Sequence, residues 1–363
     1  MPASPVRYDP SAEQPTPDEA EAIENLKASF RHILDTTSKD YGHAVRSVHA
    51  KGHGIVSGTF KVLDDLPPEL AQGLFATPGE YEAIVRFSTA PGDILDDAVS
   101  SPRGVAVKVL AVPGERLGEP DGGEQDFVMV NGPVFGAATP ADFAKNLKLL
   151  AATTDRVEGA KKALSATLQV VESALETVGL KSSLITQLGG APEVHPLGET
   201  YFSQVAFRYG DYIAKFALVP VSLGLTERTG DIVNVSGRPD AIRENVCEVM
   251  IEQGGAWELR VQLCTDLDTM PVEDPTVEWD AQQSPFRPVA TLSVAPQQAW
   301  TDGLSQAQED RLSFSPWHGL VAHQPLGGIN RARRENYEFS ASYRADFNTC
   351  PVHDVRALAD LPA

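Results

Sequence analysis

The spacing of hydrophobic residues predicts an amphipathic helix near the start of the chain, followed by a region of strands. Between Pro17 and Thr37, apolar side chains recur every three or four residues behind an acidic first turn, as in a helix with one buried face. These apolar positions are Ile23, Leu26, Phe30 and Leu34. From Arg46 to Val134, Gly and Pro divide short β-rich runs such as GIVSGTFKVL, YEAIVRFST and GVAVKVLAV. This pattern of short β-rich runs separated by turn residues is typical of antiparallel strands.

A helical stretch then interrupts the strands, and we expect an insertion at about residues 140–190. It begins with ADFAKNLKLLAATT and continues in a proline-free, Ala- and Leu-rich segment from Arg156 to Val178. The pattern of strands resumes in TYFSQVAFRYG, DYIAKFALVPV, WELRVQLCT and PVATLSVAP. Helix or turn is indicated by two later segments, QAQEDRL and RARRENYEFSASYR. Strands, helices and strands again predict an α+β barrel with helical decoration.

The length of 363 residues is enough for one large domain with appendages. We expect an N-terminal arm and helix over residues 1–40, a core over 41–345 and a C-terminal tail over 346–363. The opening segment MPASPVRYDPSAEQPTPDEAEA lacks the charged-then-apolar layout of a secretory signal. It predicts a flexible arm.

Composition and charge exclude several classes of partner. Hydrophobic residues make up 42% and charged residues 22%, and no run of 18 or more apolar residues indicates a transmembrane segment. The net charge of −20, without a basic patch, argues against nucleic acid as a partner. It would also slow the approach of anionic substrates such as fatty acids, unless local arginines counteract it.

Cysteines and short motifs narrow the chemistry further. Cys247, Cys264 and Cys350 are odd in number and form no C-x-x-C pair, which predicts reduced thiols and a cytoplasmic location. The sequence contains no G-x-x-x-x-G-K-[ST], H-E-x-x-H or G-x-S-x-G motif, and no G-x-G-x-x-G opens a helix after a strand. The Gly327-Gly328 pair is interpreted as a turn.

One pair of residues has the spacing of a haem-iron ligand and its cation. Haem iron can be held by a tyrosine, which must be ionised and therefore needs a nearby positive charge. Arg333 and Tyr337 are four residues apart, so on a helix they share one face. Such a pair also occurs by chance on protein surfaces, and the spacing needs further support.

Six motifs, in order, resemble landmarks of the catalase superfamily over about residues 46–344. They are V-H-A-K-G (48–52), R-F-S-T (86–89), P-R-G-V-A-V-K (102–108), N-G-P-V-F (131–135), L-S-F-S-P (312–316) and R-x-x-x-Y-x-x-x-x-x-x-R (333–344). The chain resembles a compact, catalase-related haem peroxidase without the C-terminal extension of large catalases. The resemblance implies an antiparallel barrel of about eight strands with a helical insertion and C-terminal helices, and makes the core over 41–345 a haem-binding one.

The resemblance also implies roles for the matching residues. His49 matches the distal acid/base, which takes a proton from peroxide and returns it to the departing oxygen. Val48 would lie against the haem face, and Ser88 would orient the histidine. Tyr337 matches the iron ligand, with Arg333 as its cation.

Further positions match residues that contact the rest of the cofactor. Arg46, Arg86 and Arg344 match arginines that pair with the haem propionates, whose burial requires cationic partners. Arg46 departs from the pattern, because Val45 precedes it where an acidic residue is common. Two aromatic residues match positions at the porphyrin edge or the peroxide channel. Ordinary packing in the hydrophobic core is the alternative role for both. They are Phe135 and Phe143.

One departure bears on the substrate. Catalases have two successive asparagines before T-P-V-F, of which the first orients peroxide. Without gaps, Val130 takes that position and Asn131 matches the second, whereas a shift of one residue would restore Asn131 to the catalytic site. With Val130 there, one hydrogen-bond donor to peroxide is missing, and a larger organic hydroperoxide is favoured.

His53 also falls on the face of a strand that His49 would share, which raises a two-histidine metal site as an alternative. We do not expect one, because no third ligand follows at suitable spacing.

The sequence therefore predicts a haem b enzyme that reduces hydrogen peroxide or organic hydroperoxides. Two alternatives stay open: an enzyme that converts fatty-acid hydroperoxides, of the allene oxide synthase or hydroperoxide lyase type, and a haem-binding protein without activity. NADPH is not expected as a second cofactor, although the sequence does not exclude it. The partner is a small-molecule peroxide or lipid hydroperoxide, and the sequence leaves a homo-oligomer open.

Overall fold

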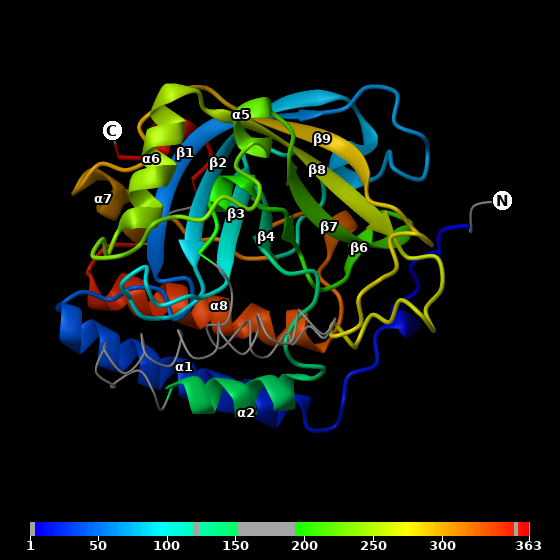
Figure 1. Ribbon diagram of the computed structural model, residues 1–363. Helices are drawn as coiled ribbons and strands as arrows, with labels where there is room; N and C mark the ends of the chain where they lie inside the picture. Colours follow the sequence, from blue (N-terminus) through cyan, green and yellow to red (C-terminus); the bar gives the residue numbers. More distant parts are fainter. Residues whose placement is uncertain (1–3, 119–122, 152–192, 352–354, 363) are drawn as a thin grey trace, which may run out of the picture.

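The computed structural model describes residues 4–118, 123–151, 193–351 and 355–362 (Figure 1). Within these residues, nine strands form one sheet in the order β5-β4-β3-β2-β1-β9-β8-β7-β6. The strands are β1 (Lys51–Val62), β2 (Gly79–Thr89), β3 (Arg103–Val109), β4 (Gln125–Val130), β5 (Tyr201–Phe202), β6 (Phe207–Tyr209), β7 (Tyr212–Pro220), β8 (Gly255–Leu263) and β9 (Arg287–Val294).

An additional pairing of β5 with β7 closes the sheet into a barrel. The ring contains eight strands, and β6 pairs with β7 outside it. Neighbouring strands are antiparallel throughout, as the register of each pair shows. The expected α+β class and eight-stranded antiparallel barrel are therefore confirmed.

Helices cover the barrel, and three of them form a layer along the lower side in Figure 1. This layer consists of α1 (Glu19–Tyr41), α2 (Pro140–Ala151) and α8 (Gly328–Phe347). The other described helices are α5 (Leu223–Thr226), α6 (Ala241–Glu252) and α7 (Leu304–Arg311), with short 3-10 turns η1 (Pro10–Ala12), η2 (Gly73–Ala76), η4 (Pro196–Gly198), η5 (Val321–His323) and η6 (Leu358–Asp360). None of the described helices is long and apolar enough to cross a membrane.

The amphipathic helix that the sequence predicts is α1. Leu26, Phe30 and Leu34 are buried on one of its faces, and the helix ends at Gly42 with a left-handed φ of 64°, a conformation that glycine adopts without steric cost. Leu26 and Phe30 pack with residues of α2 and α8 in a small apolar cluster between the three helices. The helical layer is thus bound together by its own apolar contacts.

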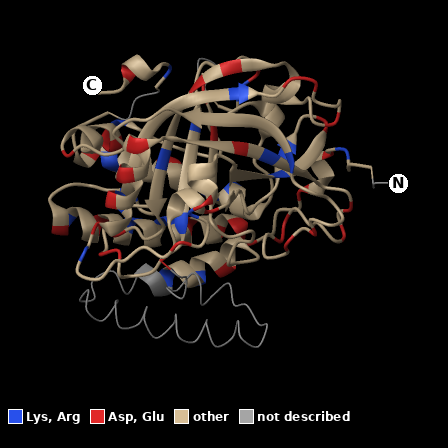
Figure 2. Cartoon of the chain, turned by 45° about the horizontal axis from the view of Figure 1, so that its top comes forward, with Lys and Arg blue, Asp and Glu red and all other residues tan. Residues whose placement is uncertain are grey.

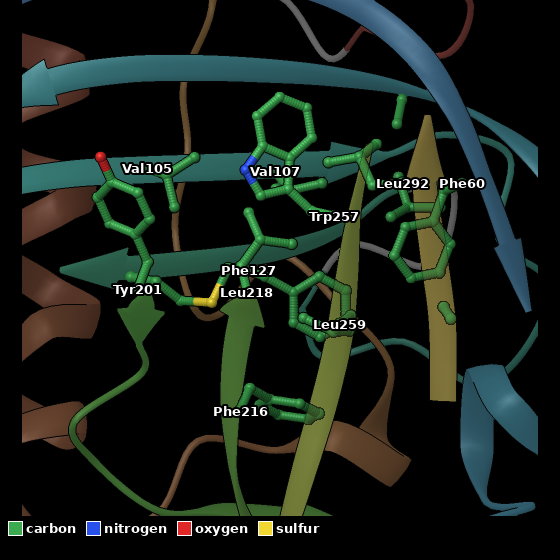
Figure 3. Packing of buried hydrophobic residues seen from close by; sticks show 14 of the residues in the cluster. Phe60, Val105, Val107, Phe127, Tyr201, Phe216, Leu218, Trp257, Leu259 and Leu292 are labelled. Atoms are coloured by element: carbon green, nitrogen blue, oxygen red, sulfur yellow. The ribbon is translucent and has the colours of Figure 1, made fainter. Parts of the chain in front are cut away.

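Side chains fill the inside of the barrel, as Figure 3 shows for the cluster around Phe127. The ring of Phe127 stacks on Phe60 with centroids 6.2 Å apart and meets Phe216 edge-on at 5.0 Å. Trp257 is fully buried and lies 6.0 Å from the ring of Phe87. An eight-stranded barrel is just wide enough for such filling, so we place the candidate site outside the barrel wall rather than within it.

The N-terminal arm is bound to the barrel, and the prediction of a flexible arm was wrong for residues 4–18. The amide of Val6 donates to the carbonyl oxygen of Cys264 at 2.8 Å, and Arg7 pairs with Tyr212 at the edge of β7. Farther along, Glu13 accepts from Arg331 of α8 at 2.7 Å. Sequence composition did not reveal these distant backbone partners.

Two further comparisons with the sequence concern helices. The predicted insertion begins with α2, and its segment from Arg156 to Val178 lies outside the described residues. Helix α6 was not predicted; it packs against β1 with Val246 and Val249 buried in the core cluster.

Acidic residues are spread over helices, strands and loops in the view of Figure 2, rather than gathered into one patch.

Candidate active site

The candidate site lies on the outer face of β2, β3 and β4. Ser88 in β2 pairs with Gly104 in β3, which in turn pairs with Val130 in β4. Residues directly opposite each other in antiparallel strands share one face of the sheet. The alternating neighbours belong to the barrel core, namely Phe87, Val105 and Met129. Ser88, Gly104 and Val130 therefore face away from the core.

His49 precedes β1, and its ring rests on β3. Its φ of 54° is left-handed, which is uncommon for a residue with a side chain. The ring Nδ1 lies 3.1 Å from Oγ of Ser88. A Cβ atom at Gly104 would lie 2.5 Å from this Nδ1 and still closer to Cε1. Only glycine at position 104 therefore leaves room for the imidazole, which explains the glycine of P-R-G-V-A-V-K.

The surroundings of His49 keep its imidazole neutral. Its pKa is lowered from 6.5 to about 3, first by burial and then by the positive charges of three arginines. These are Arg86, Arg333 and Arg46. Burial and nearby positive charge both disfavour the protonated ring. At neutral pH the ring can therefore accept a proton.

On the other side, α8 brings Arg333 and Tyr337 together as their spacing predicts. Nη2 of Arg333 donates to Oη of Tyr337 at 3.3 Å, and the guanidinium carbon lies 5.5 Å from the centroid of the tyrosine ring. Because Arg333 also acts on the pKa of His49, the helix side lies within electrostatic reach of the barrel side.

Asn330, one turn earlier on α8, orients the guanidinium of Arg333. Its Nδ2 donates to the carbonyl oxygens of Ala206 at 3.0 Å and Leu326 at 3.1 Å. These two bonds assign the amide orientation, so Oδ1 is left to accept from Nη1 of Arg333 at 3.4 Å. Asn330 is fully buried, and its own carbonyl oxygen accepts from the indole of Trp317 at 2.8 Å.

Arg46, Arg86 and Arg344 gather around one acidic residue, Glu309 of α7. The Glu309 carboxylate forms ion pairs with Arg86 and Arg46. Nη1 of Arg344 donates to the main-chain oxygen of Glu309 at 3.0 Å, and Nη2 donates to that of Leu312 at 3.2 Å. The three arginines expected to bind carboxylates thus lie together, although they are far apart in sequence. We call this group the arginine cluster.

A cavity of about 470 Å³ connects the arginine cluster with α8. Arg46, Val48, Tyr337 and Arg344 line it. Its volume lies in the range of ligand sites, about 300–1,000 Å³. Nε of Arg344 is buried and has no hydrogen-bond partner among the described residues.

Three other predicted residues lie beside α1 and α2. The rings of Phe135 and Phe143 meet edge-on with centroids 5.0 Å apart, and Phe143 also lies 6.5 Å from the ring of Phe30 in α1. Phe143 and Val48 both pack against the cluster between the helices. Phe135, Phe143 and His49 are not among the residues that line the cavity. Both phenylalanines also pack against the barrel core cluster, so the aromatic pair lies between the barrel and the helical layer.

The carboxamide of Asn131 is engaged on both sides. Its Oδ1 accepts from the amide of Arg103 at 2.9 Å, and its Nδ2 donates to Glu199 at 2.8 Å. Val130, by contrast, lies on the same sheet face as Ser88 and Gly104. A role for Asn131 in binding peroxide stays a prediction.

Sequence reasoning missed Glu309 and Asn330. Glu309 lies in QAQEDRL, where an exposed acidic residue on a helix is the ordinary expectation. Asn330 follows the Gly327-Gly328 pair, and Gly327 precedes α8 with a φ of 84°. The turn was recognised, but nothing in the sequence indicated the buried contact with Arg333.

His53 was considered as a metal ligand together with His49, and in the structure its imidazole lies beside a threonine instead. His53 is fully buried, and its Nε2 lies 3.3 Å from Oγ1 of Thr89. Within the part of the chain that the structure describes, no group of three or more His, Cys, Asp or Glu side chains could hold a metal ion. All three cysteines are free.

Three solved structures with a similar fold are catalases. A fungal catalase aligns with a TM-score of 0.61 and 22% identity over 88% of this chain and 64% of its own. Catalase A from Saccharomyces cerevisiae aligns with a TM-score of 0.59 and 19% identity over 88% and 66%, and a bacterial catalase with 0.61 and 18% over 97% and 66%. This chain spans less than two thirds of each of these proteins.

The family comparison is independent of these alignments. A search of curated proteins found no match. The family model described as Catalase matches residues 43–307, which include the segments of His49, Ser88 and Gly104. By this match over most of its length, the chain belongs to the catalase family.

Proposed function

We propose that this chain binds haem b and decomposes peroxides as an oxidoreductase. The observation that carries the proposal is the position of His49, held by Ser88 on the barrel wall within electrostatic reach of the Arg333–Tyr337 pair of α8. Family membership adds support, since catalases generally bind haem. A reduced, cytoplasmic location stays a prediction from the free cysteines.

The residues present fit haem by their charges and their chemistry. Three arginines, of which Arg86 and Arg344 are buried, surround a single directly bonded carboxylate, so the arginine cluster can accept the two haem carboxylates. The phenol of Tyr337, beside Arg333, would supply the iron ligand. Val48 lines the cavity and would contribute an apolar contact to the ring. The same role for Phe135 and Phe143 stays a prediction from the resemblance.

Haem, when bound, would supply an iron centre that peroxide can oxidise by two electrons. The chain's own part is to move the proton. Nε2 of His49 accepts the proton of the incoming hydroperoxide and returns it to the oxygen that leaves as water or alcohol. This exchange needs a neutral ring, which the lowered pKa of His49 provides.

Ser88 selects the tautomer of His49 that this step requires. Oγ of Ser88 lies 3.5 Å from the carbonyl oxygen of Gly104, to which it donates. We assign the Nδ1 proton of His49 to a hydrogen bond toward Ser88 Oγ, because the hydroxyl proton is then used for Gly104. Nε2 is left as the acceptor.

The position of Val130 favours organic hydroperoxides as substrates. Val130 faces the same side as Gly104, against which the His49 ring lies, and it offers no hydrogen-bond donor. We therefore propose a catalase-related peroxidase that reduces hydrogen peroxide or organic hydroperoxides, with a small organic donor or a second peroxide molecule supplying the two electrons. Conversion of fatty-acid hydroperoxides is the second candidate, also favoured by Val130.

The test is to purify the protein and record its absorption spectrum and iron content, before and after adding hydrogen peroxide or a fatty-acid hydroperoxide. We expect a ferric haem spectrum that Tyr337→Phe alters or abolishes, and peroxide consumption that His49→Ala lowers by about 10²–10⁴-fold. Product analysis then separates simple reduction from rearrangement of a lipid hydroperoxide.

Two variants serve as matched controls. Tyr343→Phe changes a tyrosine of α8 that bonds Asp35 rather than Arg333, and His32→Ala changes an exposed histidine of α1. Both should retain the spectrum and the activity. A protein that takes up no haem would contradict the proposal, and haem uptake without any peroxide turnover would leave a haem-binding protein without activity.

A further inference from the structure

Among the residues that the structure describes, Glu309 is the one that forms hydrogen bonds with all three members of the arginine cluster. Its carboxylate accepts from Nε of Arg86 at 2.7 and 2.9 Å and from Nη1 of Arg46. Its main-chain oxygen accepts from Nη2 of Arg46 at 3.2 Å and Nη1 of Arg344 at 3.0 Å. The Glu309 side chain is only 7% exposed. Neither the sequence motifs nor the reaction proposed above uses this acid.

The charges of the cluster do not balance. Three guanidinium groups carry three positive charges, and Glu309 carries one negative charge. The next acid, Asp310, bonds His43 at 2.8 Å, and its negative charge also acts on Arg46 and Arg344. Burial lowers the pKa of Arg86 to about 9 and that of Arg344 to about 10, and Arg344 adds to the effect on Arg86 by repulsion. Buried charges without partners are costly, and the cluster keeps an excess of positive charge that the cofactor's carboxylates would offset.

Glu309 is not among the residues that line the 470 Å³ cavity, and its carboxylate lies against β1. Its Oε1 lies so close to Gly52 in β1 that a Cβ atom there would overlap it, and the ring of Trp300 is 3.0 Å from the same point. This tight fit holds the carboxylate in place. Arg46 and Arg344 reach from Glu309 to the 470 Å³ cavity, which they both line. An anion in the cavity can therefore join Glu309 on these arginines without displacing it.

We propose that Glu309 is a resident counter-ion that stabilises the cofactor-free protein and limits the affinity of the arginine cluster for the cofactor's carboxylates. This inference rests on the proposed haem cofactor. It assigns Glu309 a role in setting how tightly haem is held, opposite in sign to the role of the arginines. Since Glu309 and the haem carboxylates share two guanidinium groups, each weakens the attraction that the other experiences.

The test compares Glu309→Gln with the wild type in two measurements. We expect the thermal unfolding midpoint of the cofactor-free variant to fall, because the three arginines lose their shared anion. We expect haem to leave the loaded variant for excess apomyoglobin about tenfold more slowly, because the carboxylates then meet an unopposed cluster. The same exchange with haem dimethyl ester, which lacks the two charges, should change by less than about twofold.

Two further variants separate charge from shape. Glu309→Asp keeps the charge on a shorter side chain, so its unfolding midpoint should fall while haem exchange stays close to the wild-type rate. Glu252→Gln removes an exposed charge from α6 and should change neither quantity.

Faster haem loss from Glu309→Gln would overturn the inference, because Glu309 would then only hold the cluster in shape. An equal gain for the dimethyl ester would overturn it as well, since the effect would not act through the carboxylates. A wild-type protein that binds no haem would instead overturn the proposed function itself, together with this inference. Slower loss confined to unesterified haem, with a lowered midpoint, supports it.

Discussion

On the barrel side of the site, the surroundings of His49 come from separate strands, whereas on the helix side Asn330, Arg333 and Tyr337 all come from α8. Ser88 and Gly104 meet the imidazole only because β2 and β3 pair in a particular register. The helix residues meet because each is three or four positions from the next. The barrel side therefore depends on distant pairing and close packing, and the helix side on local spacing and on one buried amide.

The largest effect that would sharpen this comparison is expected from Gly104→Ala. The added methyl group would overlap the His49 ring and displace it, and a misplacement of about 1 Å can cost about 100-fold in rate. Peroxide consumption should fall by that order while the haem spectrum is largely retained. Gly123→Ala is the control, because its new Cβ would have no neighbour closer than 3.9 Å. Full activity in Gly104→Ala would show that the ring does not need its present position.

A smaller effect is expected on the helix side from Asn330→Ala. Loss of the amide removes a hydrogen-bond partner of Arg333 and should lower peroxide consumption by about tenfold, with a shifted haem spectrum. Leaving the carbonyl oxygens of Ala206 and Leu326 without their donor should also cost about 1–3 kcal/mol in the free energy of unfolding. Asn348→Ala, which loses bonds to Ala44 instead, should lower stability without altering the spectrum. If both variants behave alike, Asn330 is purely structural.

Ser88→Ala should have a milder effect on the barrel side. The substitution keeps the strand and removes one hydrogen bond to His49, worth about 0.5–1.5 kcal/mol, or about 2- to 10-fold in rate. Steady-state peroxide consumption measures this change. Ser57→Ala removes a hydroxyl that bonds Gln297 in another part of the barrel and should leave the rate unchanged. A rate in Ser88→Ala equal to that of the wild type would remove the hydroxyl from the proposed mechanism.

The smallest expected effect concerns pH. With a pKa of about 3, His49 stays neutral between pH 8 and pH 5, so its ionisation should not appear in the pH profile of peroxide consumption. In the unfolded chain the same histidine gains its proton near its ordinary pKa of 6.5, so acid favours unfolding. The contribution of His49 to the free energy of unfolding is therefore lost as pH falls from about 6.5 toward 3.

Unfolding midpoints of the wild type and of His49→Gln at pH 7 and pH 5 test this linkage. The midpoint of the variant should fall less between the two values, because one acid-sensitive group has been removed. A steeper fall in the variant would mean that His49 is protonated in the folded protein.

The hydrophobic pattern was sufficient for much of the fold, and it failed where long-range contacts decide. Leu26, Phe30 and Leu34 predicted α1, since an amphipathic helix carries its burial pattern within one segment. Helix α6 escaped prediction, and the arm at Val6 was expected to be flexible. Its backbone bond to Cys264 joins residues that are more than 250 positions apart, and no local signal marks such a contact.

By itself, the sequence determined the strand-rich barrel class, the amphipathic first helix, the family and the pairing of Arg333 with Tyr337. Each of these depends on periodicity, motif or spacing within short segments. The tertiary structure alone decided that Val130 shares a face with Gly104, and that Glu309 stands among Arg46, Arg86 and Arg344. The reason is physical: strand register and the burial of charge are set by the packing of segments that are remote in the chain.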